Sequence, residues 1–213
     1  MIIAIDGPAA SGKGTIAKRI AAHYGLAYLD TGTLYRAVAR DTLARGGDPA
    51  DAIEALKSAK ALDPRTLGDP RLRKPGLGEA ASLVAKHPEV RNELLAYQRS
   101  FARAKSGAVL DGRDIGTVIC PEADVKLFVT ATPEERARRR YIELKGGGID
   151  LSEAEVLCDI RRRDERDKHR AAAPLRQAPD AHLLDTTNLD IDAAFRAAID
   201  LIDAAMGRAG YAG

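Results

Sequence analysis

A glycine-rich loop near the start of the chain constrains the fold more than any other feature of the sequence. It follows the apolar run 2–5 and precedes a helical pattern over 13–24. The loop consists of Gly7, Pro8, Ala9, Ala10, Ser11, Gly12, Lys13, Gly14 and Thr15. Glycines let backbone N–H groups turn inward, while a helix N-terminus and a lysine supply positive charge. We therefore predict a phosphate-binding loop between a buried strand and a helix, rather than an ordinary glycine-rich turn.

The end of this loop narrows the class of nucleotide-binding protein. Most phosphate loops have Ser or Thr directly after the lysine, whereas here Gly14 separates Lys13 from Thr15. A Gly-Lys-Gly-Thr ending is typical of nucleoside monophosphate kinases, and Thr15 is then the candidate Mg²⁺ contact. A GTP-binding switch would need an Asn-Lys-x-Asp motif, and no Asn in the chain is followed by Lys.

Short apolar runs alternate with helical patterns along the rest of the chain. Further strands are predicted at 27–30, 109–110, 125–129 and 182–185, and helices at about 33–45, 88–104, 133–144, 152–170 and from 190 onward. The segment 46–78 is rich in proline and predicts only a short helix among loops. This alternation predicts an α/β fold, a five-stranded parallel sheet with helices on both faces.

Polar residues follow each predicted strand, at Asp6, Asp30, Asp111, Thr130 and Asp185. Ligands of open parallel sheets bind beyond the carboxyl ends of the strands. We therefore expect the functional site at this edge of the sheet.

Length and composition bound the other possibilities. The chain has 213 residues, which predicts a single domain over 1–213, and no apolar run approaches the roughly 18 residues of a membrane span. A formal net charge of +2 is too small to indicate a polyanionic partner, so no nucleic-acid or membrane partner is expected. Two cysteines without metal-ligand spacing favour a reducing, cytoplasmic location.

Arginines follow several of the predicted strands. Arg36 lies in the block 29–36, and Arg113 lies in the block 111–117. Arg163, Asp167 and Arg170 are spaced so that they share one helix face. Together with the phosphate loop, the blocks 29–36, 80–82, 90–99, 111–118 and 163–174 make nearly the whole chain resemble the bacterial cytidylate kinases.

The resemblance implies a P-loop nucleoside monophosphate kinase with an acceptor-binding insertion at 31–107 and a lid at 139–170. Such a kinase transfers the γ-phosphoryl group of ATP to CMP or dCMP with Mg²⁺, and a monomer is expected. The segment 46–78 is shorter than the insertion of many bacterial members, so the acceptor subdomain is expected to be reduced.

The resemblance also implies roles for individual residues. Thr31, Arg91 and Asp114, with Arg170 as an alternative fourth residue, surround the cytosine. Ser82, Arg163 and Asp167 lie near the ribose, and Arg36 and Arg113 contact the acceptor phosphate. Lys13, Arg113, Arg163 and Arg170 act at the transferring phosphoryl group. How Arg91, Arg163 and Arg170 divide between base, ribose and phosphate stays open.

The chemistry of cytosine agrees with the role given to Asp114. A carboxylate accepts a hydrogen bond from the exocyclic amine of cytosine and repels the oxygen that uracil carries there. The alternative is that Arg113 and Asp114 simply neutralise each other at a turn. No general base is needed, because a phosphate monoester with a second pKa near 6 is already largely ionised at neutral pH.

Glycines 146–148 separate a basic helix from the helix that carries Arg163, which predicts the tip of a closing lid. Most charges of this hairpin are expected on a solvated surface, including an Asp164/Lys168 pair that only supports the helix. One or two of Arg136, Arg138, Arg139 and Arg140 should face the ligand. The segment 185–188 is either an adenine contact or an ordinary turn.

Two rival functions remain at this stage. The acceptor of the same reaction could be UMP or a small hydroxyl compound. Alternatively, abundant arginine could indicate a nucleotide-dependent RNA-binding module, against which stand the small net charge and the 4% of aromatic residues.

Overall fold

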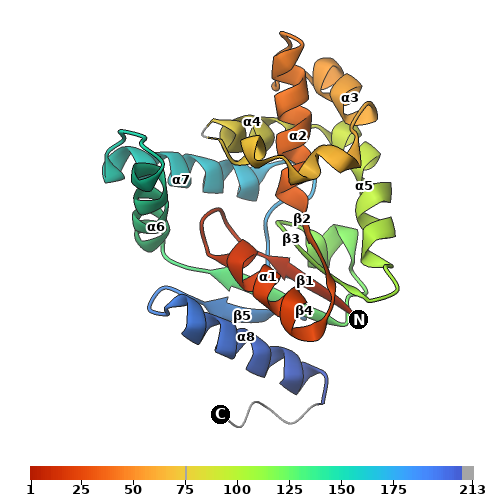
Figure 1. Cartoon of the computed structure of the whole chain (residues 1–213), viewed down its shortest axis with the longest axis vertical. Helices are drawn as coiled ribbons and strands as arrows, with labels where there is room; N and C mark the ends of the chain where they lie inside the picture. Colours follow the sequence, from red (N-terminus) through yellow and green to blue (C-terminus); the bar gives the residue numbers. More distant parts are fainter. Residues whose placement is uncertain (75, 208–213) are drawn as a thin grey trace.

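Five parallel strands form one sheet in the order β2-β3-β1-β4-β5 (Figure 1). The computed structural model describes residues 1–74 and 76–207. The strands are β1 (Ile2–Asp6), β2 (Ala27–Asp30), β3 (Ala108–Gly112), β4 (Val125–Thr130) and β5 (His182–Asp185). All four neighbouring pairs are parallel, with Asp6 opposite Gly112 and Asp30 opposite Asp111. The predicted five-stranded parallel sheet is therefore confirmed, and the polar strand ends meet at one edge.

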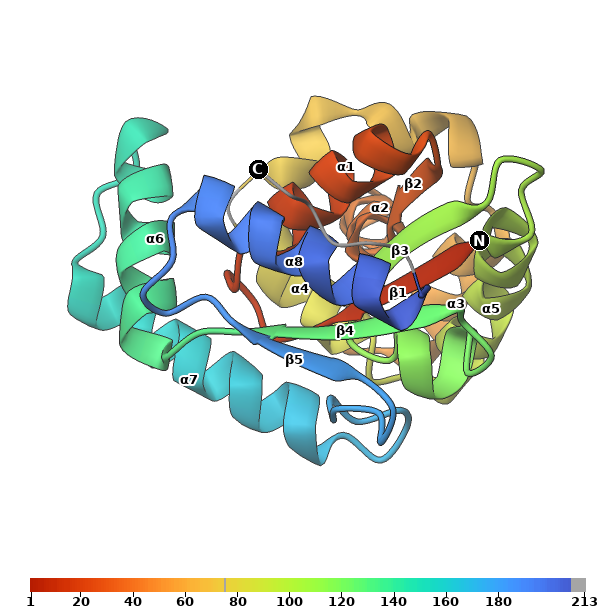
Figure 2. The same ribbon diagram turned by 90° about the horizontal axis from the view of Figure 1, so that it is seen from below.

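Alternation along β1 explains why helices cover both faces of the sheet. Ile3 and Ile5 pack with α1 (Lys13–Tyr24) and α8 (Ile191–Ala205), which lie on one face (Figure 2). Ala4 points to the opposite face and packs with residues of the helices between β2 and β3. Because successive side chains of a strand point to opposite faces, one short apolar run supplies two cores.

The chain between β2 and β3 is almost entirely helical. It comprises α2 (Thr31–Ala44), α3 (Ala52–Lys60), η1 (Pro64–Gly68), η2 (Pro70–Arg73), α4 (Leu77–Val84) and α5 (Pro88–Ala102). The short helix expected within 46–78 is α3, and two 3₁₀ turns capped by Asp63 and Asp69 follow it. Helix α2 begins directly at the end of β2, two residues earlier than predicted, so Thr31 lies at the helix start beside the strand ends.

The helices α6 (Pro133–Gly146) and α7 (Glu153–His169) form a hairpin that projects from the rest of the fold (Figure 1). The hairpin has a small core of its own, in which Ala137 and Leu144 pack on Val156 and Ile160. The predicted capping box of Ser152 and Glu155 starts α7. In the described part of the chain, no helix is long and apolar enough to cross a membrane.

A short π-helix, η3 (Ile115–Ile119), follows β3 and was not predicted. The Asp6 carboxylate accepts hydrogen bonds from the backbone N–H groups of Ile115 and Gly116, both at 2.8 Å. Asp6 immediately precedes the glycine-rich loop, and Asp114 immediately precedes η3. This buried carboxylate therefore fixes the two polar segments of the site relative to each other.

Candidate active site

A cavity of about 750 Å³ opens at the carboxyl ends of the strands, between the sheet, the helices of the 31–107 region and the α6–α7 hairpin. The predicted site residues that line it are Ala9, Ala10, Ser11, Gly12, Lys13, Gly14, Thr15, Thr31, Arg36, Ser82, Arg91, Arg113, Asp114, Arg163, Asp167 and Arg170. Gly7 and Pro8 lie at the base of the loop and are not part of the lining. The structure thus gathers residues from segments far apart in the sequence around one space.

The glycine-rich loop has the backbone that a phosphate cradle requires. Gly12 precedes α1 with a φ of 83°, and a Cβ on Gly7 would lie 2.0 Å from the carbonyl oxygen of Val129. The ammonium of Lys13 donates to the Pro8 carbonyl at 3.0 Å. Burial, followed by the repulsion of Arg113, lowers the pKa of Lys13 to about 7. An anionic ligand beside Lys13 would therefore favour the charged form of its side chain.

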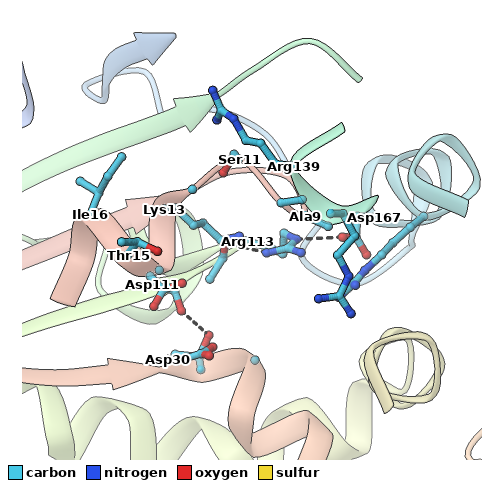
Figure 3. Close-up of a pocket in the computed structure, with 18 of the residues that line it drawn as sticks. Ala9, Ser11, Lys13, Thr15, Ile16, Asp30, Asp111, Arg113, Arg139 and Asp167 are labelled. Atoms are coloured by element: carbon cyan, nitrogen blue, oxygen red, sulfur yellow. Dashed lines mark hydrogen bonds and ion pairs between the residues drawn. The ribbon is translucent and has the colours of Figure 1, made fainter. Parts of the chain in front are cut away.

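Carboxylates lie beside Thr15 at the start of α1. Tyr28 donates its hydroxyl proton to Asp111 at 2.7 Å, and Arg36 donates to Asp30 at 2.5 Å. Burial, followed by the charge of Asp30, raises the pKa of Asp111 to about 6. Figure 3 shows Asp30 and Asp111 on the same side of the cavity as Thr15.

The oxygen donors beside the loop suit Mg²⁺. That ion usually binds through one or two carboxylates and the phosphates of its substrate, keeping several waters. No group of three or more His, Cys, Asp or Glu side chains that could hold a metal occurs in the described residues. The hydroxyl of Thr15 and the carboxylates of Asp30 and Asp111 therefore fit a shared site better than a cage made by protein alone.

Asp114 is the buried centre of a second cluster. It accepts hydrogen bonds from Arg91 on α5 and from Arg170 just after α7, the latter at 3.4 Å. The guanidinium of Arg91 also lies over the Tyr35 ring, 5.6 Å from its centroid. Thr31 donates to the backbone carbonyl of Asp111 at 2.9 Å, which holds its hydroxyl beside the strand end.

Asp167 organises a third cluster between these two. It accepts a hydrogen bond from Arg113 at 2.8 Å (Figure 3). It accepts a second one from Ser82 at 3.4 Å. Arg113 and Asp114 therefore have separate partners, and the interpretation that they neutralise each other at a turn is wrong. Burial and the nearby Arg113 lower the pKa of Arg163 to about 10.

Four buried polar atoms of lining residues make no hydrogen bond within the described residues. They are Ser11 Oγ, the Tyr35 hydroxyl oxygen, Arg36 Nε and Arg163 Nε. A buried polar atom without a partner is costly, and such atoms concentrate at functional sites. Because these atoms lie at one cavity, a polar ligand bound there could supply their missing hydrogen bonds.

The basic face of α6 divides between the cavity and the protein interior. Arg138, Arg139 and Arg140 line the cavity, whereas Arg136 does not. Arg139 donates to the carbonyl of Thr186 at 2.6 Å and to its hydroxyl at 3.0 Å. Thr186, from the segment after β5, is itself buried and part of the lining.

Sequence reasoning missed several participants. Tyr28 and Tyr35 line the cavity, but each stands in an apolar pattern that reads as core. The expected Asp164/Lys168 surface pair is wrong, because Asp164 is buried and paired with Arg136 on the neighbouring helix. A single ion pair between two helices leaves no periodic signal in either sequence.

The parallel sheet, the phosphate loop and the arginine-lined cavity define a P-loop kinase of the nucleoside monophosphate class. A solved structure of an uncharacterized protein from Eubacterium ventriosum has a similar fold, with a TM-score of 0.56 at 16% identity over 95% of this chain and 98% of that one.

Sequence comparison narrows the class. A family model described as cytidylate kinase matches residues 3–204. A cytidylate kinase of Rhodopseudomonas palustris (strain ATCC BAA-98 / CGA009) is 60% identical over 204 residues, covering 96% of each chain. A cytidylate kinase of Nitrobacter winogradskyi is 57% identical over 212 residues, covering 100% of both. The chain belongs to the cytidylate kinase family and is an ATP-dependent kinase.

Proposed function

We propose that this chain transfers the γ-phosphoryl group of ATP to CMP or dCMP, giving ADP and CDP or dCDP. The observation that carries the proposal is the single cavity in which Lys13 of the phosphate loop meets the clusters centred on Asp114 and Asp167. A donor phosphate chain on the loop would point toward an acceptor bound at those clusters.

In this proposal, different side chains of the cavity contact the base, the ribose and the phosphate of the acceptor. Asp114 accepts from the cytosine amine, with Thr31 and Arg91 beside the base. Ser82 and Asp167 contact the ribose, and Arg36 and Arg113 bind the acceptor phosphate. Arg163 and Arg170 come from α7 and the residue after it, close to the other arginines, and with Lys13 they act on the transferring group.

The cationic lining supplies what phosphoryl transfer chiefly needs. The reacting groups are all anionic, so catalysis consists of bringing them into line and stabilising charge on the transferring phosphoryl group. In the free protein, burial and then the repulsion of Arg113 lower the pKa values of both Lys13 and Arg163. An anionic transition state relieves that repulsion, so these cations bind it tightly.

Mg²⁺ would be held by Thr15 with Asp30 and Asp111, where it would neutralise phosphate charge. Tyr28 and Arg36 orient the two carboxylates, and both carboxylates line the cavity together with Thr15. These assignments are supported by the oxygen chemistry of the three side chains and by their common place at the cavity.

We further propose that 31–107 is the acceptor-binding insertion and 139–170 the lid. The first supplies Arg36, Ser82 and Arg91, and the second supplies Arg163 and Asp167. Gly148 has a φ of 78° at the hairpin tip, where a glycine tolerates the turn. Closure of this hairpin would exclude water and so prevent hydrolysis of ATP.

A monomer in a reducing cytoplasm, acting on mononucleotides rather than nucleic acid, is the simplest form of the proposal. One chain supplies every residue assigned above. Cys120 is buried and Cys158 exposed, and both are free thiols.

The test is the rate of ADP release with CMP, dCMP, UMP, AMP and GMP as acceptors. We expect kcat/KM for CMP and dCMP to exceed that for AMP and GMP by at least about a hundredfold, about 2.7 kcal/mol of discrimination. Equal activity on AMP would contradict the assignment of the base, and a preference for UMP would favour the first rival function.

A further inference from the structure

Arg136 is the most buried arginine of the α6–α7 hairpin, with 3% of its surface exposed, although it lies on a basic helix. Its Nε donates to the carbonyl of Ala131 at 2.9 Å. Its Nη1 donates to the carbonyl of Ala9 at 3.1 Å and to Asp164 Oδ1 at 3.0 Å, and Nη2 donates to Asp164 Oδ2 at 2.5 Å. One side chain thus joins α6, α7 and the phosphate loop.

Stability alone does not account for such a group. Burying an ion pair costs desolvation that its attraction often fails to offset, and apolar replacements of similar volume are commonly as stable. The hairpin also has an apolar core of its own, in which Ala137, the residue after Arg136, packs on α7. What an apolar replacement would lose is the bond to the phosphate loop.

That bond acts on the conformation of the loop. Ala9 and Ala10 share a planar trans peptide, so the Ala9 carbonyl and the Ala10 N–H point in opposite directions. Arg136, which is not a lining residue, holds the carbonyl on its own side and thereby turns the Ala10 N–H away from itself. Ala10 has a φ of 58°, a conformation that a non-glycine residue adopts at a cost and keeps only when its surroundings hold it.

The other end of the pair lies on the acceptor side. Asp164 is 6% exposed and follows Arg163 directly in α7. One turn further along, Asp167 binds Arg113 and Ser82. A shift of α7 toward an acceptor therefore moves Asp164, and the two hydrogen bonds from Asp164 to Arg136 carry that shift to Ala9.

We propose that Arg136 and Asp164 are a positioning pair that couples acceptor binding to the phosphate loop. The acceptor makes the loop bind the donor more tightly, and by thermodynamic reciprocity the donor tightens acceptor binding by the same factor. This inference rests on the proposed function, since it takes the acceptor site to be the one around Asp114 and Asp167. Neither Arg136 nor Asp164 lines the cavity, so both act through other residues.

The test measures the dissociation constant of a non-hydrolysable ATP analogue by calorimetry, with and without saturating CMP. The ratio of the two constants is the coupling factor, which is independent of the active fraction of a preparation. We expect a factor of about ten for the native protein, within the usual range for coupled sites. The Asp164→Asn variant should bring it to within about twofold of unity.

A second variant guards against misfolding. Removing one partner of a buried pair leaves an uncompensated charge, whereas Arg136→Gln with Asp164→Asn removes both charges and keeps two amides that can bond to each other. The glutamine side chain is shorter than that of arginine and is not expected to hold Ala9 as well. The coupling factor of this double variant should also be lost, while the affinity for the analogue alone falls only severalfold.

The matched control is the Arg161–Glu134 pair, at 2.7 Å, which also joins α7 to α6 but is exposed and does not touch the loop. The double variant Glu134→Gln, Arg161→Gln should keep the native coupling factor. A native factor of one, or an unchanged factor in the Arg136 and Asp164 variants, would overturn the inference while leaving the kinase assignment intact. If CMP did not bind the native protein at all, both the inference and the proposed function would fail.

Discussion

At the residue scale, the chemistry of the site depends on charges held close together in a buried space. The charges of Arg113, Arg163, Asp30 and Asp111 all act on Lys13. Burial and the two arginines lower the pKa of Lys13, and this lowering outweighs the increase caused by the carboxylates, so that the pKa is about 7. The free protein therefore keeps Lys13 only partly protonated at neutral pH.

This state of Lys13 predicts proton uptake when ATP binds. At pH 8 Lys13 is mostly neutral in the free protein, and the triphosphate favours its charged form, so binding of MgATP should take up to about one proton. Calorimetry in buffers of different ionisation enthalpy measures this number. The Lys13→Ala variant should lose turnover by orders of magnitude, keep a native far-UV CD spectrum, and take up no proton in any residual binding.

The control for that prediction is Lys60→Ala, an exposed lysine at the end of α3. It should behave as the native protein does. Proton exchange near zero at pH 8 in the native protein would show that Lys13 is already charged before ATP arrives.

Residue types at strand ends were predictable from the sequence, but their partners were not. Asp30 and Asp111 could be placed at one edge of the sheet because each follows an apolar run. That Asp114 would accept from both Arg91 and Arg170 required a fold that brings α5 and the end of α7 together. Charged groups carry no periodic pattern that identifies such partners.

At the element scale, strong local signals gave reliable boundaries. Helix α1 spans the predicted residues 13–24, and the capping box of α7 is present. Helix α4 was missed because it is short and begins between two glycines, Gly76 and Gly78, which ordinarily mark a loop. The π-helix η3 was missed because Asp6, far away in the sequence, supplies the acceptors for its first N–H groups.

The link between Asp6 and η3 predicts a pH dependence of stability. Burial raises the pKa of Asp6 to about 7 in the folded protein, from an ordinary value near 4. Between these values the folded state holds the proton more tightly than the unfolded state. The contribution of Asp6 to the free energy of unfolding therefore falls as pH rises from about 4 to about 7, and is constant above that.

The Asp6→Asn variant isolates this contribution, since an amide does not titrate. Urea unfolding of both proteins at pH 5, 6, 7 and 8 gives the difference in stability at each pH. We expect the advantage of the native protein over the variant to shrink up to about pH 7 and then to level off. An advantage that stays constant from pH 5 to pH 8 would mean that Asp6 is ionised in the folded state throughout.

At the scale of the whole molecule, residues from three parts of the fold line the cavity: the sheet with its phosphate loop, the helices of 31–107 and the α6–α7 hairpin. Figure 1 shows how these three parts are arranged. Each part contributes charged side chains, and the site is complete only when all three parts come together. The fold class was predictable because parallel sheets follow from alternating strands and helices. The way the hairpin meets the loop was not predictable, because it depends on Arg136, a candidate for ligand contact in the sequence, and on Asp164, which was expected on the surface.

The central proposal for the whole molecule is that Asp114 recognises the base of the acceptor. Its direct measure is the ratio of kcat/KM for CMP to kcat/KM for UMP, in the native protein and in Asp114→Asn. An amide can donate to the uracil oxygen that a carboxylate repels, so we expect the ratio to fall by about tenfold to a hundredfold, the discrimination typical of a well-placed contact to a base edge. Both values come from the same preparation, so partial misfolding cancels. A variant that kept the native ratio would contradict the account.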